Sequence, residues 1–405
     1  MILAPHDSLA PHDSKAIGPK NILMVAAVDP SVPNASVLHL AAMANAFTAL
    51  GHRVELAMPA PASGQPRALG DENRPYIIHY WPYGARFGIP RVFSPLLFAF
   101  RAAEMAWRNQ ADIIYIRSAL FTWPLTAFCR LLTRATVVTE HNGWIQDEIK
   151  TLRGRRLAAW LALRFQLLDS RFSHLVRAVT PGLARLLVEG GEAAGKITVL
   201  GNGTDIRHFH PIGRASALAR MGLPEDRFYI GFIGNLAPWQ GVSMAIEALP
   251  EIRQTHPEAE LIIAGGGPEL EALTDKARSL GVAPVVRFLG STDYDQANAA
   301  VNCFDLAVAP FITGRNSRIG LSPLKIRDYA AAGRAILAAD ILGIREPGDD
   351  WIAVFAPDSV ADFAEKAVSL IDDPARRDTL GKAARRHAEE SFAWSHIAAG
   401  LLARL

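Results

Sequence analysis

The sequence predicts an α/β protein with two domains, each a doubly wound parallel sheet covered by helices. The chain has 405 residues, enough for two separate cores. Short apolar runs of strand length alternate with longer segments of helix length, which is typical of β-α-β units. This pattern restarts at residue 228, after a stretch from 206 to 226 that contains Pro211, Gly213 and Pro224 and suits a linker.

The composition is that of a globular protein. Half of the residues are hydrophobic and 20% are charged, and the net charge of +2 gives no global field that would attract nucleic acid. Cys129 and Cys303 lie far apart within apolar runs, so we expect no disulfide and a reducing cytoplasm as the compartment. We find no apolar run of the ~18 residues that a membrane-spanning helix needs, and no signal-peptide pattern.

Residues 1–20 are expected to form a disordered tail. They contain the hexapeptide LAPHDS twice, at 3–8 and at 9–14, with a proline and no helical or strand period in either copy. The histidines of the repeat could instead bind a metal, but a solvated tail is the favoured interpretation.

The first half of the chain alternates strands and helices in order. The predicted strands are 22–27, 54–57, 112–116, 136–139, 178–180 and 197–200, and the predicted helices are 37–50, 96–109 and 121–132. Asn34 and Ser36 stand where the first helix begins, and His141 and Asn142 follow a strand directly. Because parallel strands end at one edge of a sheet, we expect these four residues at the carboxyl edge.

The second half repeats the pattern. Its predicted elements are the strand 228–233, the loop 234–241, the helix 242–255, and the strands 260–264, 305–309 and 335–339. The final helices, 375–405, include Phe392 and Trp394 and are expected to cross back to the first half.

The stretch LSPLKIRDYAAAG at 321–333 is the centre of the prediction. Ser322 is a good N-cap with Pro323 at the first helical position, and Gly333 suits a left-handed C-terminal cap. A helix N-terminus at the edge of a sheet attracts anions, above all phosphate. The cations Arg315, Arg318 and Lys325 stand beside it, Arg315 and Arg318 in a predicted polar loop at 314–320. An ordinary β-α-β unit with solvated basic residues is an equally weighted alternative.

Two weaker motifs each allow a structural and a functional interpretation. Gly265, Gly266 and Gly267 follow a strand, and would form either a tight turn or a close approach to a ligand. Asp293 and Asp295 form a D-x-D motif, which favours helix capping over metal binding. Taken by itself, His141 would be interpreted as a core histidine. Because a phosphate-binding helix N-terminus is expected across the cleft from it, a functional role is favoured.

The segment 150–177 is basic and amphipathic. It holds seven Lys or Arg residues against one acid, Asp169, with leucines and Trp160 between them. This pattern is compatible with an anionic membrane surface. The alternative is a helix that packs Trp160 and the leucines on its own sheet while its arginines remain in water.

Several motifs together resemble glycosyltransferase family 4, whose members have the GT-B fold of two Rossmann-like domains facing each other across a cleft. The matching stretches are GHRVEL (51–56), EHNG (140–143), VTPGLARLL (179–187), ITVLGNGTDIRHFHP (197–211), FIGNLAPWQGV (232–242), LIIAGGGPELEAL (261–273), LSPLKIRDYAAAGRAILAAD (321–340) and FAW (392–394). The resemblance covers about residues 21–405. It implies an acceptor-side domain at 21–205, a nucleotide-sugar domain at 206–385, and a C-terminal helix at 386–405.

The resemblance implies a glycosyltransferase of hexosyltransferase type, which moves a sugar with retention from a nucleotide diphosphate sugar, without a metal or another cofactor. The acceptor would be a sugar, as a lipid-linked or polysaccharide precursor. We expect a cytoplasmic protein, with a peripheral position on the inner face of the membrane as an option through 150–177, and no nucleic acid as partner. A catalytically degenerate relative that serves as a binding or scaffold protein is the alternative.

The resemblance also assigns site residues. His141 and Lys325 would be catalytic, and Asn34, Ser36 and Asn142 would face the acceptor. The donor-binding residues would be Gly234, Asn235, Gln240, Gly266, Arg315, Arg318, Leu321, Ser322 and Asp328. Asp328 would hold the ribose hydroxyls, and His141 would contact the transferred sugar.

The chain departs from the family pattern at three positions. Asn235 and Gln240 stand where the family has Arg and Lys, and Gly320 stands where it has the first of two glutamates. Two lost charged hydrogen bonds would weaken donor binding by roughly 3–6 kcal/mol. Either Arg315, Arg318 and Lys325 compensate, which is the favoured interpretation, or donor binding is weak or absent.

Overall fold

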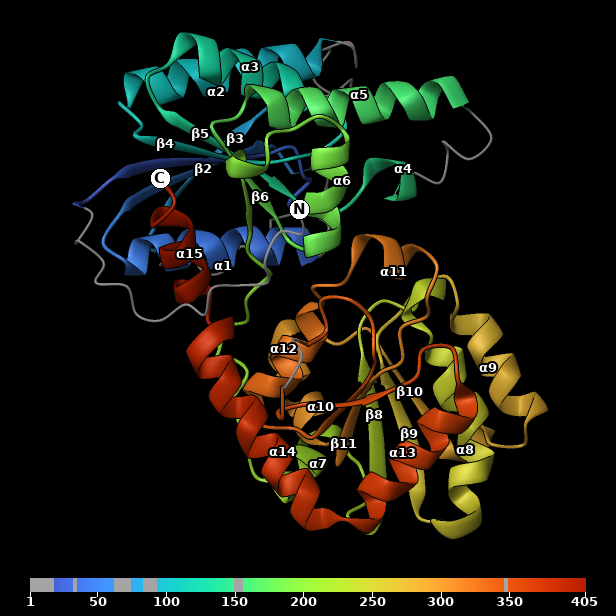
Figure 1. The fold of residues 1–405 in the computed structure, drawn as a ribbon. Coiled ribbons are helices and arrows are strands. Elements are labelled where there is room, and N and C mark those ends of the chain that lie inside the picture. The colour runs from blue at the N-terminus through green and yellow to red at the C-terminus, as the bar shows by residue number, and fades with distance from the viewer. Residues whose placement is uncertain (1–17, 32–34, 62–73, 83–92, 149–155, 346–348) are drawn as a thin grey trace.

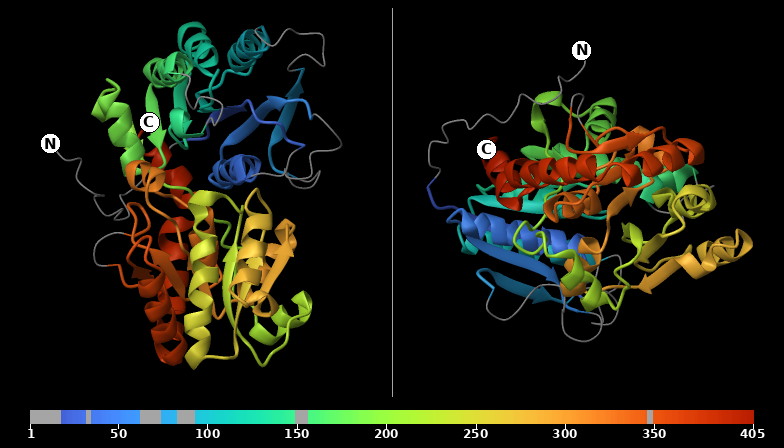
Figure 2. Two further views of the ribbon diagram at one scale, coloured as in Figure 1. Left: turned by 90° about the vertical axis from the view of Figure 1, so that its right-hand side faces the viewer. Right: turned by 90° about the horizontal axis from the view of Figure 1, so that it is seen from below.

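The computed structural model describes residues 18–31, 35–61, 74–82, 93–148, 156–345 and 349–405 (Figure 1). Residues 1–17 of the predicted tail and Asn34 lie outside the described residues, and so do residues 150–155 of the basic segment. Two parallel sheets form the described chain, each with helices on both faces (Figures 1 and 2). The predicted fold class is therefore confirmed.

The first sheet has seven strands in the order β3-β2-β1-β4-β5-β6-β7. They are β1 (Asn21–Ala26), β2 (Arg53–Pro59), β3 (Ile77–Trp81), β4 (Ile113–Arg117), β5 (Thr136–His141), β6 (Leu175–Ala178) and β7 (Ile197–Val199). Along β1, Ile22 and Met24 join one buried core while Leu23 and Val25 join another. Successive side chains of a strand point to opposite faces, so β1 supplies both cores of this domain.

The helices of this domain cover the two faces of the sheet. They are α1 (Ala35–Ala49), α2 (Ser94–Arg108), α3 (Trp123–Leu132), α4 (Ile145–Glu148), α5 (Arg156–Phe172) and α6 (Pro181–Glu189). Helices α2, α3 and α5 lie side by side as one outer layer, and α1 covers the opposite face (Figure 1).

The second sheet has six strands in the order β10-β9-β8-β11-β12-β13. They are β8 (Phe228–Ile233), β9 (Ala259–Ala264), β10 (Val286–Gly290), β11 (Leu306–Ala309), β12 (Ile336–Ala339) and β13 (Ala353–Phe355). The helices are α7 (Arg214–Met221), α8 (Val242–Thr255), α9 (Leu270–Ser279), α10 (Tyr294–Asn302), α11 (Arg315–Ile319), α12 (Leu324–Ala331), α13 (Val360–Asp372), α14 (Pro374–His387) and α15 (Trp394–Leu402). The strands and helices predicted for this half therefore match the observed elements closely.

The chain passes between the domains twice, and the two passages run side by side. Thr204 pairs with Ala393 in a parallel bridge, and its N–H donates to the carbonyl of Phe392 at 2.7 Å. Beyond the bridge, α15 packs against α1 (Figure 1). There Trp394 meets the ring of His39 edge-on at 4.6 Å between centroids. The exact domain boundaries stay predictions.

Several local predictions need correction. Residues 315–319 form the short helix α11 and not a loop. Ser322 is not the N-cap of α12, because its hydroxyl accepts a hydrogen bond from the N–H of Asn202 at 2.8 Å and the residue before the helix is Pro323. A contact with Asn202, just before the linker, has replaced the local cap. Gly333 has the expected left-handed φ of 66°, and Asp293 caps α10 by accepting from the N–H of Gln296, as predicted.

Helix α5 packs Leu163 and Leu167 against the core beside β6 but leaves its outer apolar side chains exposed. Trp160 is 49% exposed and Leu157 is 70% exposed, while Gln166 and Asp169 are buried on the inner face. The interpretation that Trp160 lies against the sheet is therefore wrong. None of the helices in the described part of the chain is long and apolar enough to cross a membrane.

Candidate functional site

A cavity of about 180 Å³ lies between the two domains. It is lined by loops at the carboxyl edges of both sheets: Asn142, Gly143, Val179, Thr180, Leu183 and Asn202 from the first half, and Trp239, Gln240, Phe311, Arg315, Ile319, Gly320, Leu321, Ser322 and Pro323 from the second. Helices α6 and α11 face each other beside it (Figure 1). Ligands of open α/β sheets bind outside the carboxyl ends of strands, so this is the candidate site.

Contacts across the interface hold this cavity closed on one side. The hydroxyl of Thr180 donates to the carbonyl of Ile319, and a Cβ on Gly182 would lie 2.6 Å from the carbonyl oxygen of Arg318. Only a glycine permits that approach of α6 to α11. The two domains are therefore in direct backbone contact beside the cavity.

The start of α12 forms the floor of the cavity in the second domain. Leu321, Ser322 and Pro323 line it, and the unpaired N–H groups of the first helical turn lie directly behind them. Arg315 also lines the cavity, with its guanidinium 5.3 Å from the centroid of the Trp239 ring. Arg318 is exposed and does not line it.

Glycines pack the two neighbouring loops of this domain together. Gly234 and Gly265 have positive φ values of 137° and 142°, and a Cβ on Gly265 would lie 1.9 Å from the carbonyl oxygen of Gly234. The carbonyl of Gly266 accepts from the N–H of Leu236 at 2.9 Å, and Asn235 lies against Gly267. Gly234, Asn235 and Gly266 are thus brought together behind the lining residues, of which Gln240 is one.

Lys325 reaches from α12 to this glycine loop. Its buried ammonium group lies 2.6 Å from Oε1 of Gln240 and 3.6 Å from the centroid of the Phe232 ring. In the described part of the chain no carboxylate forms an ion pair with it. Burial therefore lowers the pKa of Lys325 well below its ordinary range.

Asp328 lies on the other side of α12, toward the linker. Its carboxylate accepts from the hydroxyl of Thr204 at 2.7 Å. Burial raises the pKa of Asp328 to about 7, although this hydrogen bond acts in the opposite direction. Asp328 does not line the cavity.

His141 ends β5 directly beside the lining residues Asn142 and Gly143. It is 1% exposed, and its Nδ1 lies 3.4 Å from Nε2 of Gln166 on α5. Its Nε2 is buried and has no hydrogen-bond partner in the described structure. Burial lowers the pKa of His141, although Asp169 and Glu140 act in the opposite direction.

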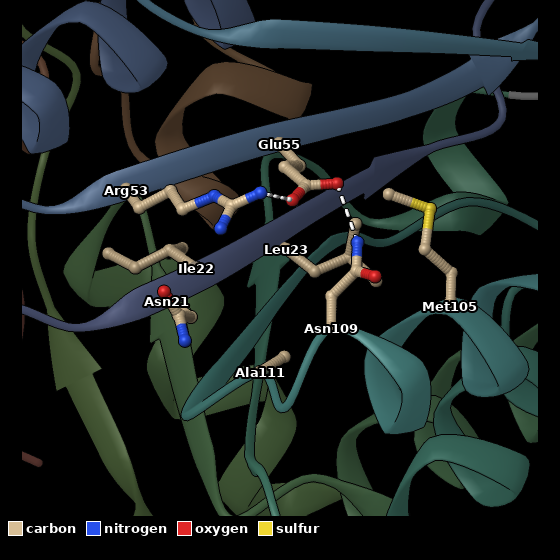
Figure 3. A pocket seen from close by; sticks show the side chains of 8 residues that line it. All are labelled: Asn21, Ile22, Leu23, Arg53, Glu55, Met105, Asn109 and Ala111. Atoms are coloured by element: carbon tan, nitrogen blue, oxygen red, sulfur yellow. Dashed lines mark hydrogen bonds and ion pairs between the residues drawn. The ribbon is translucent and has the colours of Figure 1, made fainter.

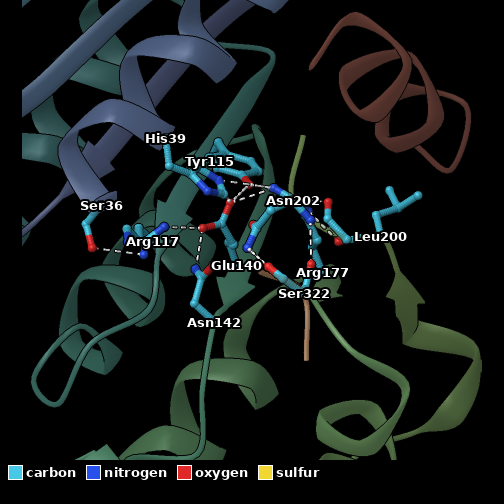
Figure 4. A network of polar contacts seen from close by, with 11 residues as sticks. Ser36, His39, Tyr115, Arg117, Glu140, Asn142, Arg177, Leu200, Asn202 and Ser322 are labelled. Atoms are coloured by element: carbon cyan, nitrogen blue, oxygen red, sulfur yellow. Dashed lines mark hydrogen bonds and ion pairs between the residues drawn. The ribbon is translucent and has the colours of Figure 1, made fainter. Parts of the chain in front are cut away.

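A buried charge network next to His141 was not predicted (Figure 4). Glu140 accepts from Arg117 at 2.6 Å, from Arg177 at 2.7 Å and from His39 at 2.8 Å, and also from Tyr115 and from the Asn142 amide. Burial alone would raise the pKa of Glu140, but these neighbours lower it well below its usual value. Burial lowers the pKa of His39 to about 4, so His39 is neutral.

The network extends to both ends of the candidate site. Arg177 also donates to the carbonyls of Leu200 at 3.1 Å and Gly201 at 2.5 Å, which begin the segment that carries Asn202. Arg117 donates to the hydroxyl of Ser36 at 3.0 Å. The sequence signal that could have revealed the network is a glutamate inside an otherwise apolar buried strand. Gln166 could have been found as a polar residue on the inner face of α5.

A second, small pocket lies at the opposite, amino edge of the first sheet (Figure 3). Its volume of about 10 Å³ is no more than one water needs. There Glu55 accepts from the amide of Asn109 at 2.8 Å and pairs with Arg53 at 3.3 Å. We regard it as structural. Among the described residues, no group of three or more His, Cys, Asp or Glu side chains could hold a metal ion.

Comparison with known proteins gives matches over both domains. The family model described as Glycosyltransferase Family 4 matches residues 36–208, and the model described as Glycosyl transferases group 1 matches residues 227–373. A glycogen synthase of Mycobacterium tuberculosis is 29% identical over 309 residues, which is 73% of this chain and 68% of the relative. A D-inositol 3-phosphate glycosyltransferase of Salinispora arenicola is 32% identical over 224 residues, 51% of this chain and about half (48%) of that relative.

Solved structures share the fold across nearly the whole chain. HepE of Anabaena in complex with UDP superposes with a TM-score of 0.74 at 20% identity, covering 95% of this chain and 100% of that one. Sucrose-phosphate synthase of Thermosynechococcus elongatus gives a TM-score of 0.74 at 17% identity, covering 95% and 98%. With the two family models, these matches lead to one conclusion: the chain belongs to glycosyltransferase family 4 and is a glycosyltransferase with the two-domain GT-B fold.

Proposed function

We propose that this glycosyltransferase moves a hexose, with retention and without a metal, from a nucleotide diphosphate sugar to a lipid-linked or polysaccharide precursor. One observation carries the proposal: the cavity between the sheets combines a helix N-terminus and Arg315 on one wall with the loop that follows His141 on the other. Such a cavity suits a substrate with an anionic end and a sugar end.

The diphosphate would lie at the start of α12. The N–H of Ser322 and those of the first turn of α12, together with Arg315, would neutralise the charge that grows on the leaving phosphate, whereas the N–H of Leu321 already donates to the carbonyl of Leu342 at 2.8 Å. Arg318 would assist from the rim if α11 moves toward the ligand. These groups are fixed before the reaction, so they stabilise the transition state without reorganising.

Lys325 and Gln240 would act as a pair at the same end. The ammonium donates to Oε1 of Gln240, so both amide hydrogens of Gln240 remain available to an anion in the cavity. The cation that the family carries on the glycine loop would thus be supplied from α12. Gly234, Asn235 and Gly266 would hold the loop close to the donor.

His141 would contact the transferred sugar. The lowered pKa keeps the ring neutral near pH 7, and a neutral ring can donate from one nitrogen to a sugar hydroxyl. Asn142 lines the cavity, and Ser36 is tied to the same network through Arg117. Asn142 and Ser36, with Asn34, would therefore face the acceptor.

Two fold neighbours support a nucleotide diphosphate donor. The fold neighbour HepE was solved with UDP and with UDP-glucose, and the fold neighbour starch synthase IV of Arabidopsis thaliana was solved with ADP and acarbose. We therefore propose UDP-hexoses and ADP-hexoses as the first donors to examine.

The outer layer of the acceptor domain supports a membrane-bound acceptor. Its helices expose large apolar side chains: Phe93, Leu96, Phe100 and Trp107 at α2, Phe121, Leu131 and Leu132 at α3, and Leu157, Trp160 and Leu161 on α5. Arginines lie among them, and the two acids of these helices are engaged, Glu104 with Arg108 and Asp169 with Thr122 and Thr126. An apolar face with a positive rim suits the surface of an anionic bilayer.

Binding and transfer test the proposal. Calorimetry with UDP, GDP and ADP should identify one nucleotide that binds, since a ligand that prefers the folded state also raises the melting temperature. The matching nucleotide sugar, incubated with lipid extract, should then yield a product whose anomeric proton coupling equals that of the donor. Inversion of the anomeric centre, or an absolute need for a divalent metal, would contradict the proposal.

A further inference from the structure

Gln166 is held in one orientation by the loop that follows β5. Its Oε1 accepts from the N–H of Ile145 at 3.1 Å, and its Nε2 donates to the carbonyl of Gly143 at 2.8 Å. A backbone donor and a backbone acceptor therefore fix which end of the amide is the oxygen and which is the nitrogen.

The fixed amide determines where the proton of His141 lies. The remaining hydrogen on Nε2 of Gln166 points at Nδ1 of His141, 3.4 Å away, so Nδ1 must be the acceptor. A neutral imidazole has one donor and one acceptor nitrogen. The proton therefore lies on Nε2 of His141.

Nε2 of His141 is the atom without a partner. It is buried, and no described residue accepts from it. An unsatisfied buried N–H is costly and rare in native proteins, and a contact with a substrate is one of the reasons for which it persists. The adjacent residues Asn142 and Gly143 line the cavity between the domains, so a substrate hydroxyl is the natural acceptor for this N–H.

We infer that Gln166 is a positioning residue, which holds His141 in the tautomer that donates from Nε2 to the substrate. The inference rests on the proposed contact of His141 with the transferred sugar. Gln166 touches no substrate itself and acts through the ring and through the carbonyl of Gly143.

The charged groups around His141 set the background for a test by pH. Glu140 precedes it on β5, Asp169 faces it from α5, and Glu192 and Lys196 act on it from beyond α6. In the wild type the donor N–H is present in the neutral ring, so activity should stay level as pH rises above neutrality. It should fall on acidification, when a proton on Nδ1 would meet the amide hydrogens of Gln166.

The variant Gln166→Glu should reverse this profile. The introduced carboxylate and the ring of His141 form a pair that can bind one proton more than the neutral ring alone. When this extra proton has dissociated at high pH, the carboxylate accepts from Nδ1–H, and Nε2 of His141 carries no proton. At low pH the pair keeps that proton, on the ring or on the carboxyl, and Nε2–H is restored. We expect kcat to drop about tenfold or more at pH 8, as for one lost hydrogen bond, and to recover toward pH 6.

Gln146→Glu is the matched control. Gln146 bonds to the Ala159 carbonyl at 3.2 Å and to the Trp144 indole at 3.3 Å, and so joins the same helices without contacting His141. Gln146→Glu introduces the same charge nearby, but its activity should keep the wild-type dependence on pH. An unchanged profile in Gln166→Glu, or the same reversal in Gln146→Glu, would overturn the inference.

Nitrogen NMR of histidine-labelled wild-type protein tests the tautomer without any variant or any substrate. A proton on Nε2 of His141 is expected, and a proton on Nδ1 would refute the inference even if Gln166→Glu failed to fold. A chain that binds no nucleotide but shows the Nε2–H tautomer would instead count against the proposed function alone.

Discussion

Moving the positive charge between Lys325 and Gln240 should remove and then restore donor binding. Lys325→Met deletes the buried ammonium, and adding Gln240→Lys supplies one from the glycine loop. Because Nζ of Lys325 and Oε1 of Gln240 are only 2.6 Å apart, the ammonium of a lysine at 240 can reach nearly the same point. The double variant therefore tests the position of the charge independently of the element that carries it.

The size of the effect follows from the geometry. A unit charge ~5 Å from a phosphate, at an effective dielectric constant of about 20, contributes roughly 3 kcal/mol. A hydrogen bond to a charged group contributes roughly 1.5–3 kcal/mol. Lys325→Met should thus weaken the binding of the nucleoside diphosphate by about tenfold to a hundredfold, and the double variant should recover most of this loss.

Stability separates this effect from misfolding. The Lys325 ammonium is buried beside Phe232 with one neutral partner, so Lys325→Met should stabilise the protein by roughly 1–3 kcal/mol. Gln240→Lys alone places two ammonium groups together and should destabilise it. A variant that melts higher but binds worse has lost a ligand contact and not its fold.

Calorimetry with the nucleoside diphosphate that the wild type binds is the assay, and Lys382→Met is the matched control. Lys382 is exposed on α14, pairs with Asp378 at 2.6 Å and does not line the cavity. The reasoning is refuted if Lys325→Met binds as tightly as the wild type, or if the double variant binds no better than Lys325→Met.

Three further predictions follow from buried or exposed side chains. The pKa of Asp328 is raised from 3.8 to about 7, so its burial costs stability as pH rises through this window, by about 4 kcal/mol at most above pH 7. The variant Asp328→Asn should therefore be more stable than the wild type at pH 8 and equally stable near pH 4. Equal melting temperatures at pH 8 would contradict this. Glu140→Gln leaves Arg177 buried without its counter-ion and should cost about 3–5 kcal/mol in urea unfolding, so a loss below ~1 kcal/mol would show that the network is not a charge pair. Trp160→Ser should reduce co-sedimentation with anionic vesicles at low salt severalfold. The control Leu280→Ser, at a 41% exposed site of the other domain, should not reduce it. An equal loss of vesicle binding in both variants would exclude α5 as the contact.

The order of strands and helices could be predicted because it depends on local patterns. Apolar runs such as 228–233 and 260–264 are long enough for one buried strand each, and both became strands within a residue of their predicted ends. Gly333 took the left-handed conformation that ends a helix. Where a local rule failed, as at Ser322, a partner 120 residues away in sequence had taken the side chain.

What the sequence determined by itself is therefore the architecture: two parallel sheets, and the helix N-terminus at 321–324 facing the gap between them. Tertiary structure alone decided which side chains face that gap. It left Arg315 at the cavity, Arg318 exposed and Lys325 behind Gln240, and it set Gln166 against His141. Hydrophobic periodicity acts over neighbouring residues, whereas these contacts join residues up to 85 positions apart, whose distances are fixed only when the domains pack.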